Sequence, residues 1–467
     1  MCPISANRSK SPPFLRASFA LWGRPFTRIL AALLTLLLFC TGSHAYSVLT
    51  HEEIVDLLWT DEICPLLLNR FPALTEEQIK EAHAYAYGGA VIQDLGYYPF
   101  GSSEFSDLVH YVRSGDFVRE LIAESQDANE YAFALGSLAH YASDNSGHPA
   151  VNQAVSIQYP KLRVKYGVSV RYAEDKTAHL KTEFGFDMVQ VARNRYASQQ
   201  YHEFIGFKVS KGLLERVFPI VYGIPLAEVL PYEDLAIGSY RYAISRLIPE
   251  MTQVALKTHK KDVMKENPGF EKRKFLFRLS RSDYEKEWGK DYPKPGFFAE
   301  VLAVFLRYVP KIGPFKALAF NSPTAQTEEM YFKSINTTVD QYRLYLREVR
   351  SDALVIPNLD LDSGNPTIAA EYSLTDDTYA QWLSQLTTRK FDLASPGLRE
   401  NILQYYADLS APYGTKKNLT RWQAVLKSLE ELKSFTPNAT VADTPLQKQN
   451  PERKESPNRR EVERFHE

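Results

Sequence analysis

Apolar residues recur at intervals of three and four along most of the chain after residue 46, which is the pattern of amphipathic helices. No sustained run of alternating apolar and polar residues predicts a large sheet. We therefore predict an all-α protein with a mostly helical C-terminal extension. The predicted helical segments are 51–58, 75–96, 127–149, 174–196, 207–217, 232–258, 296–308, 326–348, 376–388 and 397–408.

Three of these segments begin at residues that favour a helix N-terminus. The starting residues are Thr50 with Glu53, Thr75 with Gln78, and Asp127. Each of the first two pairs fits the capping-box spacing, in which the two side chains satisfy each other's backbone N–H groups. Gly147 and Pro149 predict that the third helix ends close to Pro149, since proline removes a helix donor.

The chain has 467 residues, of which 24% are charged and 13% aromatic, so it is long enough for two or three domains and too aromatic for global disorder. The 55 Lys and Arg residues nearly balance the 56 Asp and Glu residues, which argues against a nucleic-acid scaffold held by basic patches.

The amino-acid composition changes at 260–295, a segment rich in charged residues and proline. We predict a leader at 1–45, a catalytic domain at 46–250, a helical region of unassigned role at 251–435, and a disordered tail at 436–467.

Residues 1–45 have the features of an export signal. They contain five basic residues and no acidic one, and their removal leaves 50 basic against 56 acidic residues. An apolar run from Ile29 to Cys40 precedes Ser43 and Ala45, the small residues that signal peptidase prefers. We expect cleavage before Tyr46 and export to the periplasm or beyond the cell. The alternative is a membrane anchor, although about a dozen apolar residues are too few to span a bilayer.

Cleavage would leave Cys64 as the only cysteine, so the mature chain would have no intramolecular disulfide. Cys64 lies in an apolar context that favours a core role over a reactive thiol. An exported protein without disulfides must be stabilised by its core or by bound metal.

Histidines and carboxylates at helical spacing form the most informative pattern. His140 and Asp144 are four residues apart and share a helix face, and His148 follows at the predicted helix end. His179 and Glu183 repeat the same spacing on a later helix. Imidazole nitrogen and carboxylate oxygen are ligands of zinc. A single such pair is more often a surface ion pair, but two pairs with an additional histidine indicate a metal site.

Two further residues are weaker candidates. Asp94 extends a stripe of small residues, Ala82, Ala86 and Ala90, which predicts a close contact with another helix. A carboxylate at the end of such a stripe must be paired, bound to metal or exposed. His110 lies in an apolar stretch, where a core histidine is the more common case.

The order of these residues resembles that of the zinc-dependent phospholipase C family, related in fold to the P1-type nucleases and close to the glycosylphosphatidylinositol-specific phospholipase D branch. The resemblance covers about 46–245 and implies a phospholipase C/P1 nuclease-like helical domain with three zinc ions. The free N-terminal amine is itself a zinc ligand in this family. Here Tyr46 precedes His51 by five residues, so the predicted cleavage site and the predicted metal site coincide.

The resemblance implies a ligand set for each ion. Asp144 would bridge the first two sites, and Asp94 would also orient the attacking water or act as general base. The implied sets are Tyr46, His51 and Asp144; Asp94, His110, His140 and Asp144; and His148, His179 and Glu183. Paired divalent ions would bind a hydroxide that attacks a phosphodiester.

We expect a phospholipase C that acts on phospholipid headgroups and contacts a membrane surface transiently. Glu183 and the four-residue step from Asp144 to His148 favour lipid over nucleic acid, whereas Leu49 and Leu95 do not match the choline-specific bacterial enzyme. The alternatives are a P1-like single-strand nuclease or nucleotidase, for which nucleic acid would be the partner, and a non-catalytic metal-stabilised protein. The oligomeric state stays open.

A separate acidic segment has the partial pattern of a calcium loop. Asn358, Asp360 and Asp362 alternate before Gly364, but the glycine comes one position late and position twelve is Ala369. We therefore expect a solvated acidic turn rather than a metal site.

Overall fold

A computed structural model describes residues 48–98, 100–192, 208–242 and 323–437. The predicted leader, the predicted segment 296–308 and nearly all of the predicted tail lie outside the described residues. Within these ranges the protein is all-α, as predicted, and the only strands are the two-residue β1 (Leu359–Asp360) and β2 (Asn365–Pro366), which pair antiparallel.

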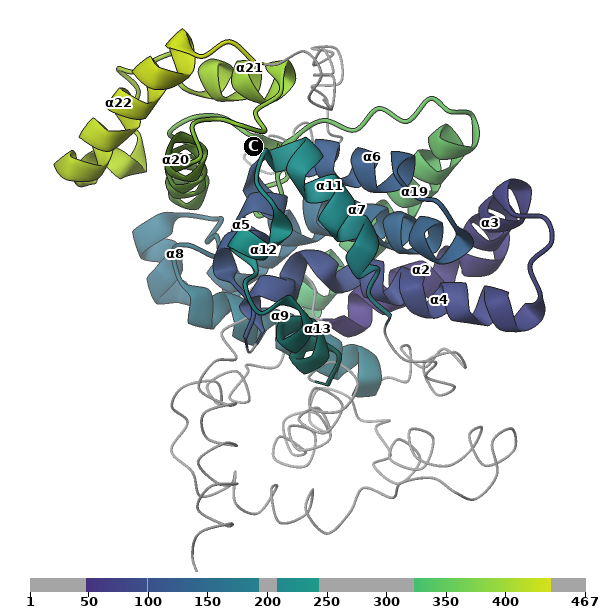
Figure 1. Ribbon diagram of the computed structural model, residues 1–467. Coiled ribbons are helices and arrows are strands. Elements are labelled where there is room, and N and C mark those ends of the chain that lie inside the picture. Colours follow the sequence, from purple (N-terminus) through teal and green to yellow (C-terminus); the bar gives the residue numbers. More distant parts are fainter. Residues whose placement is uncertain (1–47, 99, 193–207, 243–322, 438–467) are drawn as a thin grey trace, which may run out of the picture.

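By their order along the chain, the helices are divided here into an N-terminal group and a C-terminal group, which Figure 1 distinguishes by colour. The N-terminal group consists of α2 (Val48–Leu58), the π-turn η1 (Trp59–Ile63), α3 (Cys64–Arg70), α4 (Glu76–Val91), the 3₁₀ turn η2 (Ile92–Tyr97), α5 (Ser103–Tyr111), α6 (Ser114–Ala123), α7 (Ala128–Gln158), α8 (Pro160–Tyr166), α9 (Lys176–Ala192), α11 (Lys211–Tyr222), α12 (Leu226–Val229) and α13 (Glu233–Tyr242). The C-terminal group consists of α19 (Ala325–Arg350), α20 (Ser373–Thr388), α21 (Pro396–Tyr405), the 3₁₀ turn η5 (Gly414–Lys417) and α22 (Leu419–Ser434).

The 31-residue helix α7 is the central element, and α2, α4, α6, α9 and α19 all pack against it. Its start is the predicted one, because the Asp127 carboxylate accepts from the backbone N–H groups of Asn129 and Glu130. The predicted end at Pro149 is wrong, because the helix continues for nine residues beyond this proline.

The close packing of α4 on α7 depends on glycine. A β-carbon at Gly136 would lie 2.0 Å from the Ala86 oxygen, and one at Gly89 would lie 1.9 Å from the Phe133 oxygen. The alanine stripe on α4 therefore faces α7, as predicted. The absence of a side chain at Gly136 therefore permits this close backbone contact.

The two predicted capping boxes have different outcomes. The box at Thr75 is present, with Gln78 bonding back to the backbone of Thr75. The box at Thr50 is wrong, because α2 already starts at Val48 and Thr50 lies inside the helix. Its hydroxyl instead bonds the Asp187 carboxylate at 2.7 Å and the Tyr331 hydroxyl at 2.5 Å, so it joins α2 to α9 and α19.

The C-terminal group packs directly on the N-terminal group. Helix α19 lies along α7 and α2, and α20 packs against α5. Between them, the segment 351–372 crosses the end of α5 and contains β1 and β2. No helix within the described ranges combines the length and the apolar character needed to cross a membrane.

Candidate metal centre

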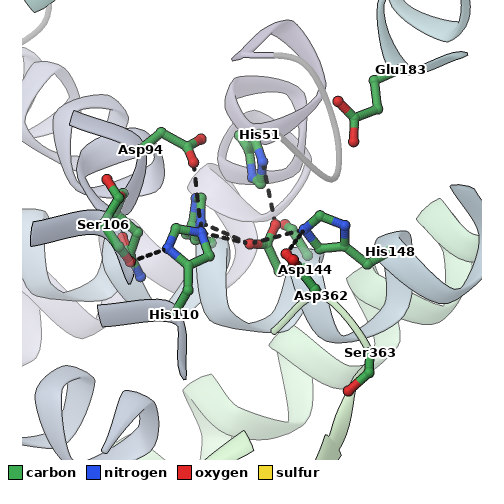
Figure 2. A network of polar contacts seen from close by, with 12 residues as sticks. His51, Asp94, Ser106, His110, Asp144, His148, Glu183, Asp362 and Ser363 are labelled. Carbon is green, nitrogen blue, oxygen red and sulfur yellow. Dashed lines mark hydrogen bonds and ion pairs between the residues drawn. The ribbon is translucent and has the colours of Figure 1, made fainter. Parts of the chain in front are cut away.

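The side chains of Asp94, His110 and Asp144 lie close together within the N-terminal group (Figure 2), and His140 contacts Asp144 there. Asp144 Oδ2 lies 3.0 Å from His140 Nε2 and 3.3 Å from His110 Nε2. His110 Nε2 lies 3.4 Å from His140 Nε2 and 3.6 Å from Asp94 Oδ1. All four residues are at most 2% exposed. Side chains up to 50 positions apart in the sequence thus place their candidate ligand atoms together in the buried interior.

The second oxygen of Asp144 faces His51. His51 Nε2 is 3.6 Å from Asp144 Oδ1, and the His51 ring stacks on the His140 ring with 4.4 Å between centroids. Asp144 therefore has a histidine nitrogen near each oxygen, as a bridging carboxylate would. Ligand atoms of His51, Asp94 and His140 also lie within 4.8 Å of one another.

His148, His179 and Glu183 form the neighbouring cluster, with ligand atoms within 4.8 Å of one another. His179 Nδ1 approaches Glu183 Oε1 to 2.6 Å, yet neither atom has a partner with hydrogen-bond geometry among the described residues. The His148 and His179 rings are 5.4 Å apart. Lone pairs that crowd together without hydrogen bonds, in residues at most 2% exposed, are costly unless a cation is bound between them.

The backbone of α7 explains how these clusters meet. Because the helix continues through Pro149, His140, Asp144 and His148 lie at i, i+4 and i+8 on one face. Proline leaves the carbonyl of Asn145 without its helical N–H partner. Gly364 of the C-terminal segment packs on that carbonyl, and a β-carbon there would lie 2.5 Å from the Asn145 oxygen. The predicted turn after His148 is therefore wrong, and His140, Asp144 and His148 all lie on one helix.

Three of the histidines have one ring nitrogen fixed by a protein acceptor. His110 Nδ1 donates to the Ser106 carbonyl at 2.7 Å, and His140 Nδ1 donates to the Ala90 carbonyl at 2.8 Å. His179 Nε2 lies 2.8 Å from Asn152 Oδ1. Each bond leaves the other nitrogen of the ring directed at the cluster, which is the usual orientation of metal-binding histidine.

The spacing of the ligand atoms fits zinc. Four ligands at about 2.0–2.1 Å in a tetrahedron are separated from one another by about 3.3 Å. His110 Nε2, His140 Nε2 and Asp144 Oδ2 are separated from one another by 3.0 to 3.4 Å, and Asp94 Oδ1 lies 3.6 Å from His110 Nε2. A mixed imidazole and carboxylate set of this geometry is one that zinc prefers.

Without metal, the charges of the two clusters differ. Burial opposes protonation of His110, but the hydrogen bond and charge of Asp144 outweigh it and raise the pKa of His110 to about 9. Burial instead lowers the pKa of His148 and, more strongly, of His179. Burial also raises the pKa of Glu183 well above its usual value. The first cluster thus holds protons on histidine and the second on the glutamate, and zinc would replace these protons.

One predicted ligand lies outside the described residues, and one carboxylate at the centre was not predicted. Tyr46 precedes the first described residue by two positions. Asp362, assigned to a solvated turn, is 0% exposed, and its Oδ1 lies 3.3 Å from His148 Nε2. The prediction of a solvated acidic turn is wrong for Asp360 as well, which is 4% exposed.

Cys64 is half-buried and unpaired, and burial raises the pKa of its thiol. A raised pKa disfavours the thiolate, so Cys64 does not have the character of a nucleophile.

Residues 50–232 match the family model described as zinc dependent phospholipase C. This segment belongs to that family. The phospholipase C segment contains His51, Asp94, His110, His140, Asp144, His148, His179 and Glu183, and it ends before the C-terminal group. No curated protein and no solved structure matches the chain. The family and the buried ligand clusters together support an enzyme of the zinc phosphodiesterase class.

Proposed function

We propose that the protein is an exported phospholipase C that binds three zinc ions and hydrolyses the glycerol-side phosphodiester bond of a phospholipid. The observation that carries the proposal is the buried cluster of His110, His140 and Asp144, with Asp94 Oδ1 3.6 Å from His110 Nε2, inside the segment that matches the family. Zinc supplies Lewis-acid polarisation of the phosphoryl oxygens and lowers the pKa of bound water.

Each residue of the centre would have a separate role in the reaction. Asp144, with a histidine nitrogen near each oxygen, would hold two ions close together. Asp94 is the carboxylate at the edge of this set, 3.6 Å from His110 Nε2, and would orient the attacking water and accept its proton. The carbonyls of Ser106 and Ala90 keep the two histidine rings in place while the charge of the reacting phosphate changes.

Export and the N-terminal ligand are joined in the proposal. Cleavage before Tyr46 would create an amine two residues ahead of α2, the helix that contains His51. His51 already lies 3.6 Å from Asp144 Oδ1, so a ligand from the start of the mature chain would complete that site. A chain that retains its leader would bind fewer zinc ions than the mature chain.

A lipid substrate is favoured by the family and by the ligand set. Glu183 provides the glutamate that the phospholipases have in the third site, and the Tyr97 ring lies 6.0 Å from the His110 ring on the wall of the centre. Tyr98 packs edge-on against Tyr240 behind it. Tyr97 is the aromatic candidate for contact with a headgroup.

The test combines metal content with two substrate panels. Protein exported from an expressing host would be sequenced from its N-terminus, its zinc measured by mass spectrometry, and its activity assayed on phosphatidylcholine vesicles and on single-stranded DNA. We expect a chain that starts at Tyr46, three zinc ions, and release of diglyceride. Release of 5′-nucleotides alone would replace the lipid by nucleic acid, and a zinc-loaded protein without turnover on both panels would contradict the enzymatic role.

Two histidine variants provide the matched comparison. His140→Gln removes a ring of the centre, whereas His83→Gln removes another buried ring, which stacks on Trp59 and bonds Asp56 at 2.9 Å. We expect His140→Gln to lose zinc and about 1000-fold or more in kcat/KM, since a metal contributes several kcal/mol to the transition state. His83→Gln should keep both.

A further inference from the structure

The carboxylate of Asp362 reaches the metal centre from the C-terminal group, outside the phospholipase C segment (Figure 2). It lies in the short connection between β1 and β2, and its side chain is fully buried. Asp362 Oδ1 is 3.3 Å from His148 Nε2, and among the described residues this oxygen has no hydrogen-bond partner. A buried carboxylate oxygen in this condition is costly without a cation.

The other oxygen of Asp362 is held firmly. Oδ2 accepts hydrogen bonds from the Tyr111 hydroxyl at 2.9 Å and from the Tyr372 hydroxyl at 2.5 Å. The two tyrosines come from α5 and from the residue before α20, so they fix the carboxylate from two sides. This arrangement directs Oδ1 at His148 and leaves it little freedom to find another partner.

The backbone around Asp362 is tied to the same ligands. Asn152 Nδ2 donates to the Asp362 carbonyl at 2.9 Å, while Asn152 Oδ1 bonds His179 Nε2 at 2.8 Å. The next connection is Leu361 N, which donates to the His110 carbonyl at 3.2 Å. The loop is thus bonded directly to His110 and, through Asn152, to His179, so a displacement of the loop would disturb both clusters.

A neighbouring aspartate shows what a structural carboxylate looks like in the same loop. Asp360 is also buried, but Thr375 Oγ1 donates to its Oδ2 at 2.6 Å and Ser363 N donates to its Oδ1 at 3.1 Å. Both oxygens of Asp360 are therefore satisfied within the loop and α20. Asp362 Oδ1 has no such donor among the described residues, and it faces His148.

We propose that Asp362 is a metal ligand of the site formed by His148, His179 and Glu183. The inference rests on the proposed zinc function, and it adds a ligand from a part of the chain that the family does not include. The 3.3 Å between Asp362 Oδ1 and His148 Nε2 equals the separation of two ligands on one tetrahedral zinc ion. Three protein ligands leave a coordination position open, whereas a fourth closes the site. The third ion then joins α7 and α9 to the C-terminal group.

The test compares Asp362→Asn with Asp360→Asn. Asparagine at 362 can keep its oxygen toward the two tyrosines, which directs an amide nitrogen, not a ligand, at His148. We expect Asp362→Asn to bind two zinc ions normally and the third more than about 100-fold weaker, which exceeds the loss usual for residues outside the ligand shell. Asp360→Asn should bind all three, as measured by competition with a chromophoric chelator.

Stability provides a readout that a merely structural role would not give. In chelator, Asp362→Asn should unfold at or above the temperature of the wild type, because it removes an uncompensated buried charge. With zinc, the wild type should gain more than the variant. Circular dichroism in both conditions confirms that the variant folds.

The outcomes separate the two proposals. A wild-type chain that binds no zinc contradicts the proposed function. A wild type with three ions and a variant that retains the third at unchanged affinity overturns the assignment of Asp362. Should Asp362→Asn not fold, diffraction at the zinc edge on zinc-loaded wild type decides: an Asp362 oxygen about 2.0–2.2 Å from the ion supports the ligand, and a separation beyond about 3 Å overturns it.

Discussion

Two buried aspartates, one in each helical group, show opposite uses of a carboxylate. Asp144 and Asp376 are both 1% exposed. Asp376 accepts from Tyr405 Oη at 2.6 Å, from Ala370 N at 2.9 Å and from Gly414 N at 2.6 Å, so protein donors surround both of its oxygens. Asp144 faces the ring nitrogens of four histidines, at 3.0 to 3.7 Å. Burial alone does not mark a functional carboxylate; the type and geometry of its neighbours do.

The largest expected effect is at Asp144. Asp144→Asn keeps the shape of the side chain but replaces a charged oxygen by an amide nitrogen between His110 and His140. We expect loss of zinc from both sites that share the residue and a fall in kcat/KM of about 1000-fold or more. Zinc analysis and a phosphodiesterase assay on the same preparation measure this. An active variant with full zinc content would mean that Asp144 resembles Asp376 after all.

The reciprocal substitution is Asp376→Asn. It places an NH₂ group against donors from Tyr405 or Gly414, so it should lower the free energy of unfolding by about 2–4 kcal/mol. Zinc content and kcat should stay at the wild-type level in the folded fraction. Urea unfolding followed by circular dichroism gives the stability, and loss of zinc from the folded variant would contradict the separation of the two regions.

The stability of the metal-free protein should depend on pH through the groups of the N-terminal clusters. The pKa of His110 is raised to about 9, above the usual value near 6.5, so its contribution to stability is complete below pH 6.5 and is lost as pH rises through 9. Glu183 has a raised pKa too, and a raised acid pKa also makes stability fall as pH rises. We expect the melting temperature in chelator to fall between pH 6.5 and 9.

Zinc should reverse this trend. Zinc binding must displace the proton on His110, so the affinity should rise about tenfold per pH unit below pH 9 for each proton released. Calorimetry in buffers of different ionisation enthalpy counts the protons. The same slope in Asp144→Asn would show that the protons come from elsewhere in the chain.

The smallest expected effect is at Gly364, where the two regions touch. Gly364 has a φ of 67°, and a β-carbon would lie 2.5 Å from the Asn145 oxygen, so Gly364→Ala should cost about 1–2 kcal/mol and weaken the third zinc site. Gly167 also has a positive φ, 89°, but a β-carbon there meets no atom within 4 Å. Gly167→Ala is therefore the control for backbone strain alone, and equal zinc affinity in both variants would show that the loop contact does not matter.

Helix spacing and capping chemistry in the sequence were sufficient for the all-α class, for the starts at Thr75 and Asp127, and for the pairing of His140 with Asp144 and of His179 with Glu183. These features depend on residues within four positions of each other. The order of histidines and carboxylates was also sufficient for the resemblance to the zinc-dependent phospholipases, which the match over residues 50–232 supports.

Only the tertiary structure determined what happens at Pro149 and Asp362. The local sequence predicts that the helix ends at Pro149 and that Asp360 and Asp362 are exposed to solvent. In the folded protein, Gly364 packs on the carbonyl that Pro149 leaves unbonded, and Tyr111 and Tyr372 hold the buried Asp362. Each result depends on a contact between residues more than 200 positions apart, Gly364 with Asn145 and Tyr111 with Asp362. The energy of burying a group depends on such neighbours, which no local pattern contains.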